Sequence, residues 1–403
     1  MLKRLEIDNL FGEYSYVIDW KQSSNKDLLY ITGPNGMGKT TILRMIDGLY
    51  PHLAADMYAN TPFSRALFVF DGNKQICLER KEAIIEWDEP TDQIPNKEIL
   101  LTCVYSAEMP MESIEESYYW RFEKQEGKDG AMRKIGEDGD KMTNMEMLLD
   151  TDQCRFFKDD RIHNAFGSDY EKECIDPDIV SEYLRKLQMN LEKSFVSGQY
   201  GIEIREWMDV EKREELDKRR NKVLKIMDLL KECDIYIGGP EQYKNLQIAK
   251  DIDLLLLLNR LENAIRENKD DILKLQTYVK SMKRFGFIGK ELRLSPIYGY
   301  RMVPANTGIP LKFEQLASGE KHLICLLNGL FFVKTESPLV LIDEPEMSYH
   351  MYWQYQFCKT MKEVVKLMHL RLLIATHQPQ MFDDDFSLTV DLWEQWDKQR
   401  RGK

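Results

Sequence analysis

Apolar and polar residues alternate with the short period of β-strands near both ends of the chain. Leu2–Ile7 and Tyr14–Ile18 alternate, whereas Leu28–Thr32 is a compact apolar run. These patterns predict half-buried strands and a fully buried strand, respectively. Further strands are expected at 67–70, 76–78, 83–87, 100–105, 155–158, 291–294, 299–303, 339–342, 370–375 and 387–392. Helical periodicity predicts helices over 39–49, 318–332 and 351–368.

The middle of the chain, about 178–285, has a helical pattern almost throughout. Near its end, apolar residues recur in alternating steps of three and four, the spacing of a packed helical seam. The seam comprises Leu254, Leu258, Leu261, Ile265, Ile272, Leu275, Val279 and Met282. Asn268 takes a polar position in it, and an earlier helix offers Leu216, Val223 and Leu230 as partners. An intramolecular helical hairpin and a dimerising coiled coil both fit this seam.

Charged residues and glycines dominate about 112–146, which predicts a flexible surface loop. Strands and helices alternate on both sides of the helical block, so we expect an α/β fold split by an insertion. The expected head has an N-terminal part at 1–176 and a C-terminal part at 287–403, with the helical insertion at 177–286 between them.

Composition narrows the classes of function. The chain has 403 residues, and its net charge of −12 does not favour strong non-specific nucleic-acid binding, although a local basic groove remains open. Its seven cysteines include no Cys-x-x-Cys pair, which argues against a disulfide framework or a zinc site. No apolar run approaches the length of a membrane helix, and the start does not read as a signal peptide. We therefore expect a cytoplasmic protein with no membrane partner.

A phosphate-binding loop follows the apolar run at 28–32. The segment Gly33-Pro34-Asn35-Gly36-Met37-Gly38-Lys39-Thr40 fits the pattern G-x-x-x-x-G-K-[ST], with a strand expected before it and a helix after it. The glycines let backbone N–H groups turn inward around phosphates at a helix N-terminus. Lys39 would reach the β- and γ-phosphates, and Thr40 would offer its hydroxyl to Mg²⁺.

A carboxylate pair, Asp343-Glu344, follows the apolar strand at 339–342. Such a pair is common by itself and often only caps a helix. Downstream of a phosphate loop, it indicates a metal ligand and a residue that activates the attacking water. We expect Asp343 to bind the metal and Glu344 to act as general base.

Two further segments accompany these motifs. Ala317-Ser318-Gly319-Glu320 opens a predicted helix, where Ser318 and Gly319 form an anion site and Glu320 can also cap the helix. His377 follows an apolar strand, where a sensor of the γ-phosphate would lie. Taken alone, the first segment would be explained as a helix cap and His377 as an incidental histidine. The order and spacing of all four motifs favour a functional role for both.

Together these motifs resemble the ABC-type ATPases of the SMC, SbcC and OLD group. The resemblance covers about 1–110 and 290–403 and includes Asn9-Leu10-Phe11-Gly12, Trp353-Gln354 and Ala375-Thr376-His377-Gln378-Pro379. More narrowly, the chain is similar to stand-alone bacterial ATPases of anti-phage defence modules, such as the AriA proteins of PARIS and the PtuA proteins of Septu. The helical insertion matches these families only in kind.

The resemblance implies an ABC-type head that sandwiches ATP and Mg²⁺ between two copies, with Lys39, Glu344 and His377 in catalysis and Thr40 and Asp343 at the metal. The implied nucleotide contacts are Gly33, Asn35, Gly36, Gly38, Lys39, Thr40 and Thr41 of one copy, with Ser318, Gly319 and Glu320 of the other. Ala317 stands where the family signature has its serine, and Asp160 stands where a Q-loop glutamine is usual. His350 would lie near a contact between heads.

Three functions fit this head. The first is a slow ATPase whose dimerisation regulates a separate effector, such as a toxic nuclease in phage defence. Roughly 25 residues follow His377, too few for the nuclease domain fused to OLD proteins, so cleavage is expected in trans. The second is a DNA-repair or chromosome-structure ATPase that grips DNA with its insertion, whose charge is mixed. The third, a transporter subunit, fits the long helical segment poorly.

Overall fold

The computed structural model assigns the chain to two compact units, one of 1–160 with 335–403 and the other of 161–334. The residues that the structure describes are 1–49, 54–85, 96–108, 111–123, 131–139, 154–157, 174–197, 210–249, 251–333 and 339–402. Among these, no helix is long and apolar enough to cross a membrane. The three-part division expected from the sequence differs from these units, because it assigns 287–334 to the head. That division stays a prediction.

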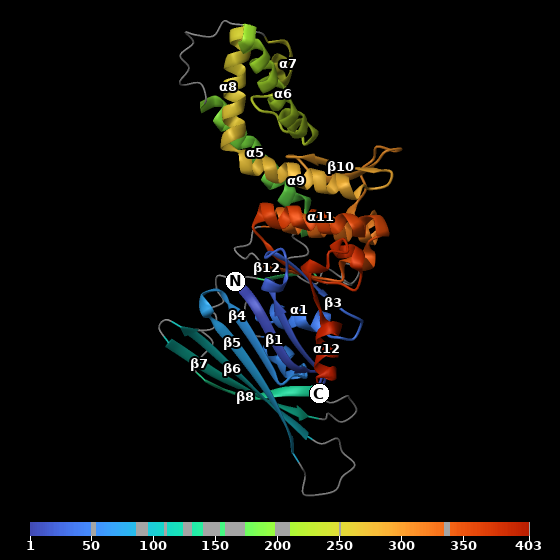
Figure 1. Ribbon diagram of the computed structural model, residues 1–403. Helices are drawn as coiled ribbons and strands as arrows, with labels where there is room; N and C mark the ends of the chain where they lie inside the picture. The colour runs from blue at the N-terminus through green and yellow to red at the C-terminus, as the bar shows by residue number, and fades with distance from the viewer. Residues whose placement is uncertain are drawn as a thin grey trace. The chain divides into compact units, whose positions relative to one another are not determined.

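The first unit contains a parallel sheet and an antiparallel sheet (Figure 1). Within the described residues, the parallel sheet has five strands in the order β14-β3-β13-β12-β9. They are β3 (Leu28–Thr32), β9 (Cys154–Phe157), β12 (Leu339–Asp343), β13 (Arg371–Ala375) and β14 (Thr389–Asp391). Buried strands of a parallel sheet are covered on both faces, which explains their continuous apolar sequences.

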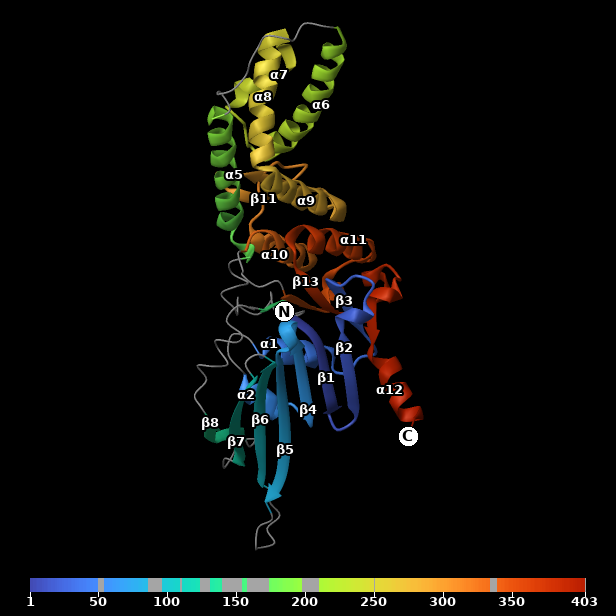
Figure 2. The same cartoon turned by 60° about the vertical axis from the view of Figure 1, so that its left-hand side comes forward.

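The antiparallel sheet has seven strands in the described part of the chain, in the order β2-β1-β4-β5-β6-β7-β8 (Figure 2). They are β1 (Leu2–Leu10), β2 (Tyr14–Asp19), β4 (Arg65–Phe70), β5 (Gln75–Ile85), β6 (Asn96–Glu108), β7 (Met111–Glu123) and β8 (Ala131–Gly139). The expectation of a flexible loop over 112–146 is therefore wrong where the structure describes it. Tyr118, Tyr119, Trp120 and Phe122 favour strand, and their β propensity outweighs the surrounding charge.

One hydrophobic core joins the two sheets. Helix α1 (Lys39–Asp47) contributes Ile42, Leu43, Met45 and Ile46 to a buried cluster that also contains buried residues of β1, β3, β4, β12 and β13. Helix α11 (Met351–Met368) packs against β3, and α12 (Leu392–Arg401) packs against β2 and β3. The short α2 (Ala55–Asn60) packs against β6. The expected α/β head with an antiparallel lobe is confirmed by this arrangement.

The second unit is mainly helical. Its helices are α5 (Pro177–Ser197), α6 (Val210–Glu232), α7 (Pro240–Ile248), α8 (Asp251–Glu267), α9 (Lys269–Phe285) and α10 (Ser318–Phe331), accompanied by the hairpin β10 (Lys290–Ser295) and β11 (Gly299–Pro304). Helix α8 packs against both α5 and α6. The predicted helical block and the two strands expected after it are confirmed, and the structure pairs these strands as an antiparallel hairpin.

The predicted seam is interrupted at Asn268, which lies between α8 and α9 with φ −112° and ψ 24°. Its side-chain amide donates to the carbonyl oxygen of Ala264 and to the hydroxyl of Ser194. An asparagine amide that bonds the backbone competes with helical hydrogen bonding. The seam is therefore divided between two helices, and α8 uses its part for packing within the chain.

Candidate active site

Three neighbouring parallel strands, β3, β13 and β12, end at one edge of the sheet, and the sequence motifs follow them. The phosphate loop follows β3, Asp343 ends β12, and His377 lies two residues beyond the end of β13. Asp343 pairs with Ala375, and Ala375 pairs with Ile31, so the three strand ends are in register. The carboxyl edge of a parallel sheet is where ligands of such folds bind, so one site unites motifs separated by some 300 residues.

The phosphate loop closes around the ammonium group of Lys39. Its Nζ donates hydrogen bonds to the carbonyl oxygens of Gly33, at 2.9 Å, and Pro34, at 3.2 Å. Lys39 is only 4% exposed. Gly38 directly before α1 has φ 87°, and a Cβ there would lie 2.9 Å from Cδ2 of Leu10. The loop is thus held in a compact form beside a helix N-terminus, whose first N–H groups have no partner within the helix and can bind an anion.

The side chains expected at the metal already contact one another. Oγ1 of Thr40 donates a 3.2 Å hydrogen bond to Oδ1 of Asp343. Burial raises the pKa of the Asp343 carboxyl to about 6, the bond from Thr40 opposes this change, and the nearby Glu344 reinforces it. A buried carboxylate that lacks a cation raises the free energy of the folded protein. Asp343 and Thr40 offer hard oxygen ligands of the kind that Mg²⁺ prefers.

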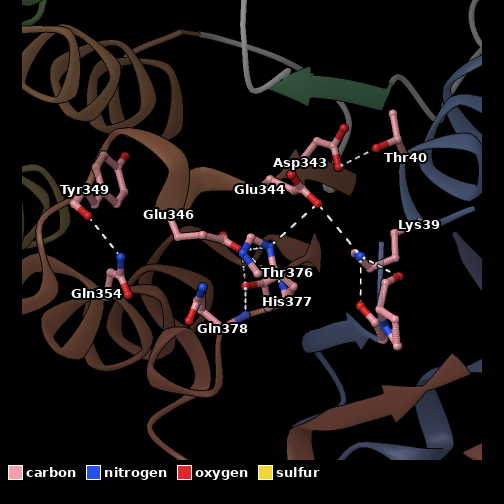
Figure 3. A network of polar contacts seen from close by, with 12 residues as sticks. Lys39, Thr40, Asp343, Glu344, Glu346, Tyr349, Gln354, Thr376, His377 and Gln378 are labelled. Carbon is pink, nitrogen blue, oxygen red and sulfur yellow. Dashed lines mark hydrogen bonds and ion pairs between the residues drawn. The ribbon is translucent and has the colours of Figure 1, made fainter. Parts of the chain in front are cut away.

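Glu344 points back into the site because its backbone is left-handed. Its φ is 40° and its ψ 51°, unusual values for a residue other than glycine, and its N–H donates to the carbonyl oxygen of Ala375 at 2.9 Å. Oε1 of Glu344 lies 3.8 Å from Nζ of Lys39 and 3.8 Å from Nδ1 of His377. This carboxylate is therefore placed between the side chains of Lys39 and His377 (Figure 3).

A second glutamate, absent from the expected set of site residues, contacts His377. Oε1 of Glu346 accepts hydrogen bonds from Oγ1 of Thr376, at 2.6 Å, and from the backbone N–H of His377, at 3.0 Å. It also lies 3.1 Å from Nδ1 of the His377 ring. The available signal was the run Asp343-Glu344-Pro345-Glu346, which places a further acidic residue two positions after Glu344.

Ser318, Gly319 and Glu320 belong to the second unit, at the start of α10. Ser318 is exposed, whereas Glu320 is buried and engaged. Its carboxylate accepts from the N–H of Ala317 at 2.9 Å and pairs with Nζ of Lys290 at 2.7 Å. These contacts give Glu320 a capping role, and its contact with nucleotide stays a prediction, as do those of Ser318 and Gly319.

The remaining predicted residues have simpler surroundings. Asn35 and Gly36 are exposed on the phosphate loop, and Thr41 is half-buried in the first turn of α1. His350 precedes α11, and its ring lies 4.9 Å from that of Trp353. Asp160, expected at the Q-loop, lies outside the described residues. The contact of His350 with a second head stays a prediction.

Residues 1–382 match the family model AAA_15, described as AAA ATPase domain. No curated protein matches. Among solved structures, this chain is similar to an SMC head bound to the C-terminal winged-helix domain of ScpA, with 13% sequence identity and a TM-score of 0.37. The superposition covers 95% of this chain and 91% of the SMC head chain. The SMC head domain from Thermotoga maritima is 12% identical with the same coverages and a TM-score of 0.33.

Proposed function

Because this chain belongs to the AAA_15 family of AAA ATPase domains, it is an ATPase, and we propose that it closes two copies of its head around ATP and Mg²⁺. One observation carries the proposal: Lys39, Asp343 and His377 converge at the carboxyl ends of three adjacent parallel strands. A lysine on a phosphate loop, a buried carboxylate beside a threonine hydroxyl, and a second carboxylate facing a histidine form the parts that phosphoryl transfer to water requires.

The phosphate loop would hold the β- and γ-phosphates of ATP with its backbone N–H groups and with Nζ of Lys39. Lys39 is bonded to the Gly33 and Pro34 carbonyls in the free protein, so it would exchange one of these acceptors for a phosphate oxygen. Thr40 and Asp343 would hold Mg²⁺, which supplies positive charge to the phosphates when it is bound.

Glu344 is the group best placed to take a proton from the attacking water. The water oxygen attacks the γ-phosphorus, the bond to the β,γ-bridging oxygen breaks, and the water proton passes to the Glu344 carboxylate. His377 would donate a hydrogen bond to a γ-phosphate oxygen and so stabilise the charge that accumulates there. The left-handed backbone of Glu344 fits this role, because strained residues concentrate at functional sites.

Exposed apolar side chains beside the site support pairing of two heads. Met347, Met351, Tyr352 and Tyr355 follow Glu346 closely, and they are 62%, 66%, 55% and 43% exposed. Large apolar side chains that cluster on a surface are typical of protein–protein contacts. In the proposed dimer Ser318 and Gly319 of the second copy would contact the γ-phosphate, as the resemblance to ABC-type ATPases implies.

The proposed dimer acts as a switch, since bound ATP would favour the closed pair and hydrolysis would release it. We propose that the switch regulates a separate effector protein, a nuclease in an anti-phage defence module. The resemblance to stand-alone defence ATPases supports this part.

The test measures the mass of the purified wild-type protein by light scattering without nucleotide, with Mg²⁺-ADP and with Mg²⁺-ATP. The proposal predicts twice the monomer mass with Mg²⁺-ATP and the monomer mass otherwise. An unchanged mass in all three states contradicts ATP-driven pairing. Tight DNA binding at low salt that weakens as salt rises would favour the DNA-repair alternative over the effector switch.

A further inference from the structure

Glu346 is a buried carboxylate with no assigned role, although it lies against the candidate active site. The residue is 4% exposed, and its Oε2 is buried with no hydrogen-bond partner in the part of the chain that the structure describes. Burial raises the pKa of the carboxyl, and the hydrogen bonds from Thr376 and from the backbone N–H of His377 oppose this change. Burying a carboxyl group costs folding free energy, and residues that carry such a cost are often functional.

Those contacts are with His377 and with the residue before it, Thr376. Oε1 of Glu346 receives the Thr376 hydroxyl at 2.6 Å and the backbone N–H of His377 at 3.0 Å, and it lies 3.1 Å from Nδ1 of the same histidine (Figure 3). Nδ1 is buried and makes no hydrogen bond with any residue that the structure describes. A small rotation of the ring would let the Nδ1–H group donate to Oε1. The hydrogen bond made by one ring nitrogen of a histidine fixes what the other nitrogen can do.

We propose that Glu346 is a positioning residue that holds the Nδ1–H of His377, so that Nε2 presents its own N–H to the γ-phosphate during hydrolysis. The hydroxyl of Thr376 orients the Glu346 carboxylate through its hydrogen bond. The carboxylate in turn holds the backbone N–H and the ring of His377. Glu344 is 3.8 Å from the same Nδ1. Without Glu346 the ring would turn toward Glu344 and occupy the general base.

This inference rests on the proposed role of His377, and a double-mutant cycle separates the two. Glu346→Gln keeps an acceptor for Thr376 and removes the charge. We expect it to lower kcat by roughly 10–100-fold, the usual cost of losing the partner that orients a functional histidine. The KM for ATP should stay within about twofold, because the phosphate loop is untouched. In a His377→Ala background the same substitution should change kcat by less than about twofold.

Three results overturn the inference: a Glu346→Gln enzyme with the wild-type kcat, an equal fold-loss in both backgrounds, or a loss confined to KM. A His377→Ala enzyme with the wild-type kcat would instead refute the role of His377. Asp71→Asn, which removes an exposed carboxylate at the turn between β4 and β5, is the charge-matched control and should not change kcat. If Glu346→Gln does not fold, Thr376→Val replaces it in the cycle, with a smaller expected loss and the same dependence on His377.

Discussion

The hydroxyl of Thr40 donates a 3.2 Å hydrogen bond to Oδ1 of Asp343, and so links the first turn of α1 to the end of β12. The two oxygens that would bind Mg²⁺ are therefore neighbours before any ion arrives. Because the carboxyl is buried and its pKa is raised to about 6, the free site is destabilised relative to the occupied one. A cation at this position would relieve that cost.

Replacing Asp343 with asparagine should stabilise the free protein and abolish Mg²⁺-dependent ATP hydrolysis. The folded-state pKa of about 6 exceeds the ordinary value of 3.8, so the folded protein binds more protons between these pH values. Asp343 thus lowers stability progressively from about pH 4 to 6 and fully above pH 6, by on the order of 3 kcal/mol. We expect a higher Tm for Asp343→Asn in EDTA at pH 7.5.

The pH dependence provides the control for this prediction. At pH 4 Asp343 is largely protonated in the folded protein, so the Tm difference between the variant and the wild type should shrink. A variant that is less stable than the wild type at pH 7.5, or equally affected at both pH values, would contradict the description of Asp343 as a strained buried carboxyl.

Replacing Lys39 with alanine should abolish tight ATP binding. Losing one charged partner from a buried ion contact weakens binding by about 2–5 kcal/mol, which is roughly 30-fold or more in Kd. Isothermal titration with Mg²⁺-ATP measures the change, and Lys74→Ala, at an exposed turn, is the control. Tight ATP binding by Lys39→Ala would remove the phosphate-loop assignment.

Gly38 should tolerate alanine less well than Gly36, although both have φ 87°. Alanine at either position pays about 1–2 kcal/mol for the left-handed backbone. A Cβ at Gly38 would also meet Leu10 at 2.9 Å, whereas a Cβ at Gly36 has nothing within 4 Å. Thermal denaturation without nucleotide should give a lower Tm for Gly38→Ala than for Gly36→Ala. Equal Tm values for the two variants would contradict this prediction, because they would mean that Leu10 moves away from the added Cβ at little cost.

Regular segments of the head were predictable from the sequence alone. β3 and α11 span the predicted residues, because an apolar run between turn residues and a continuous helical period leave little ambiguity. The sequence also placed each motif at the end of a buried strand, whereas the adjacency of β3, β13 and β12, which brings the motifs together, is known only from the sheet order. The roles of the individual residues remain proposals.

Other features depended on contacts that periodicity does not encode. The strand expected at 387–392 is only Thr389–Asp391, and α12 begins at Leu392. Asp391 caps this helix by accepting from the N–H groups of Trp393 and Glu394, a local signal that the apolar alternation concealed. The break at Asn268 and the contacts of Glu346 both depend on side chains distant in sequence, Ser194 and Thr376 respectively.

Glu344→Gln tests the central claim, that ATP bound at the phosphate loop is hydrolysed with Glu344 as general base and closes two heads. The variant keeps the shape of the side chain and removes its ability to take a proton from water. Single-turnover hydrolysis and mass by light scattering should be measured together in Mg²⁺-ATP. The account predicts hydrolysis slowed by about 10²-fold or more and a stable dimer that retains ATP. Hydrolysis at the wild-type rate by a monomeric variant would contradict it.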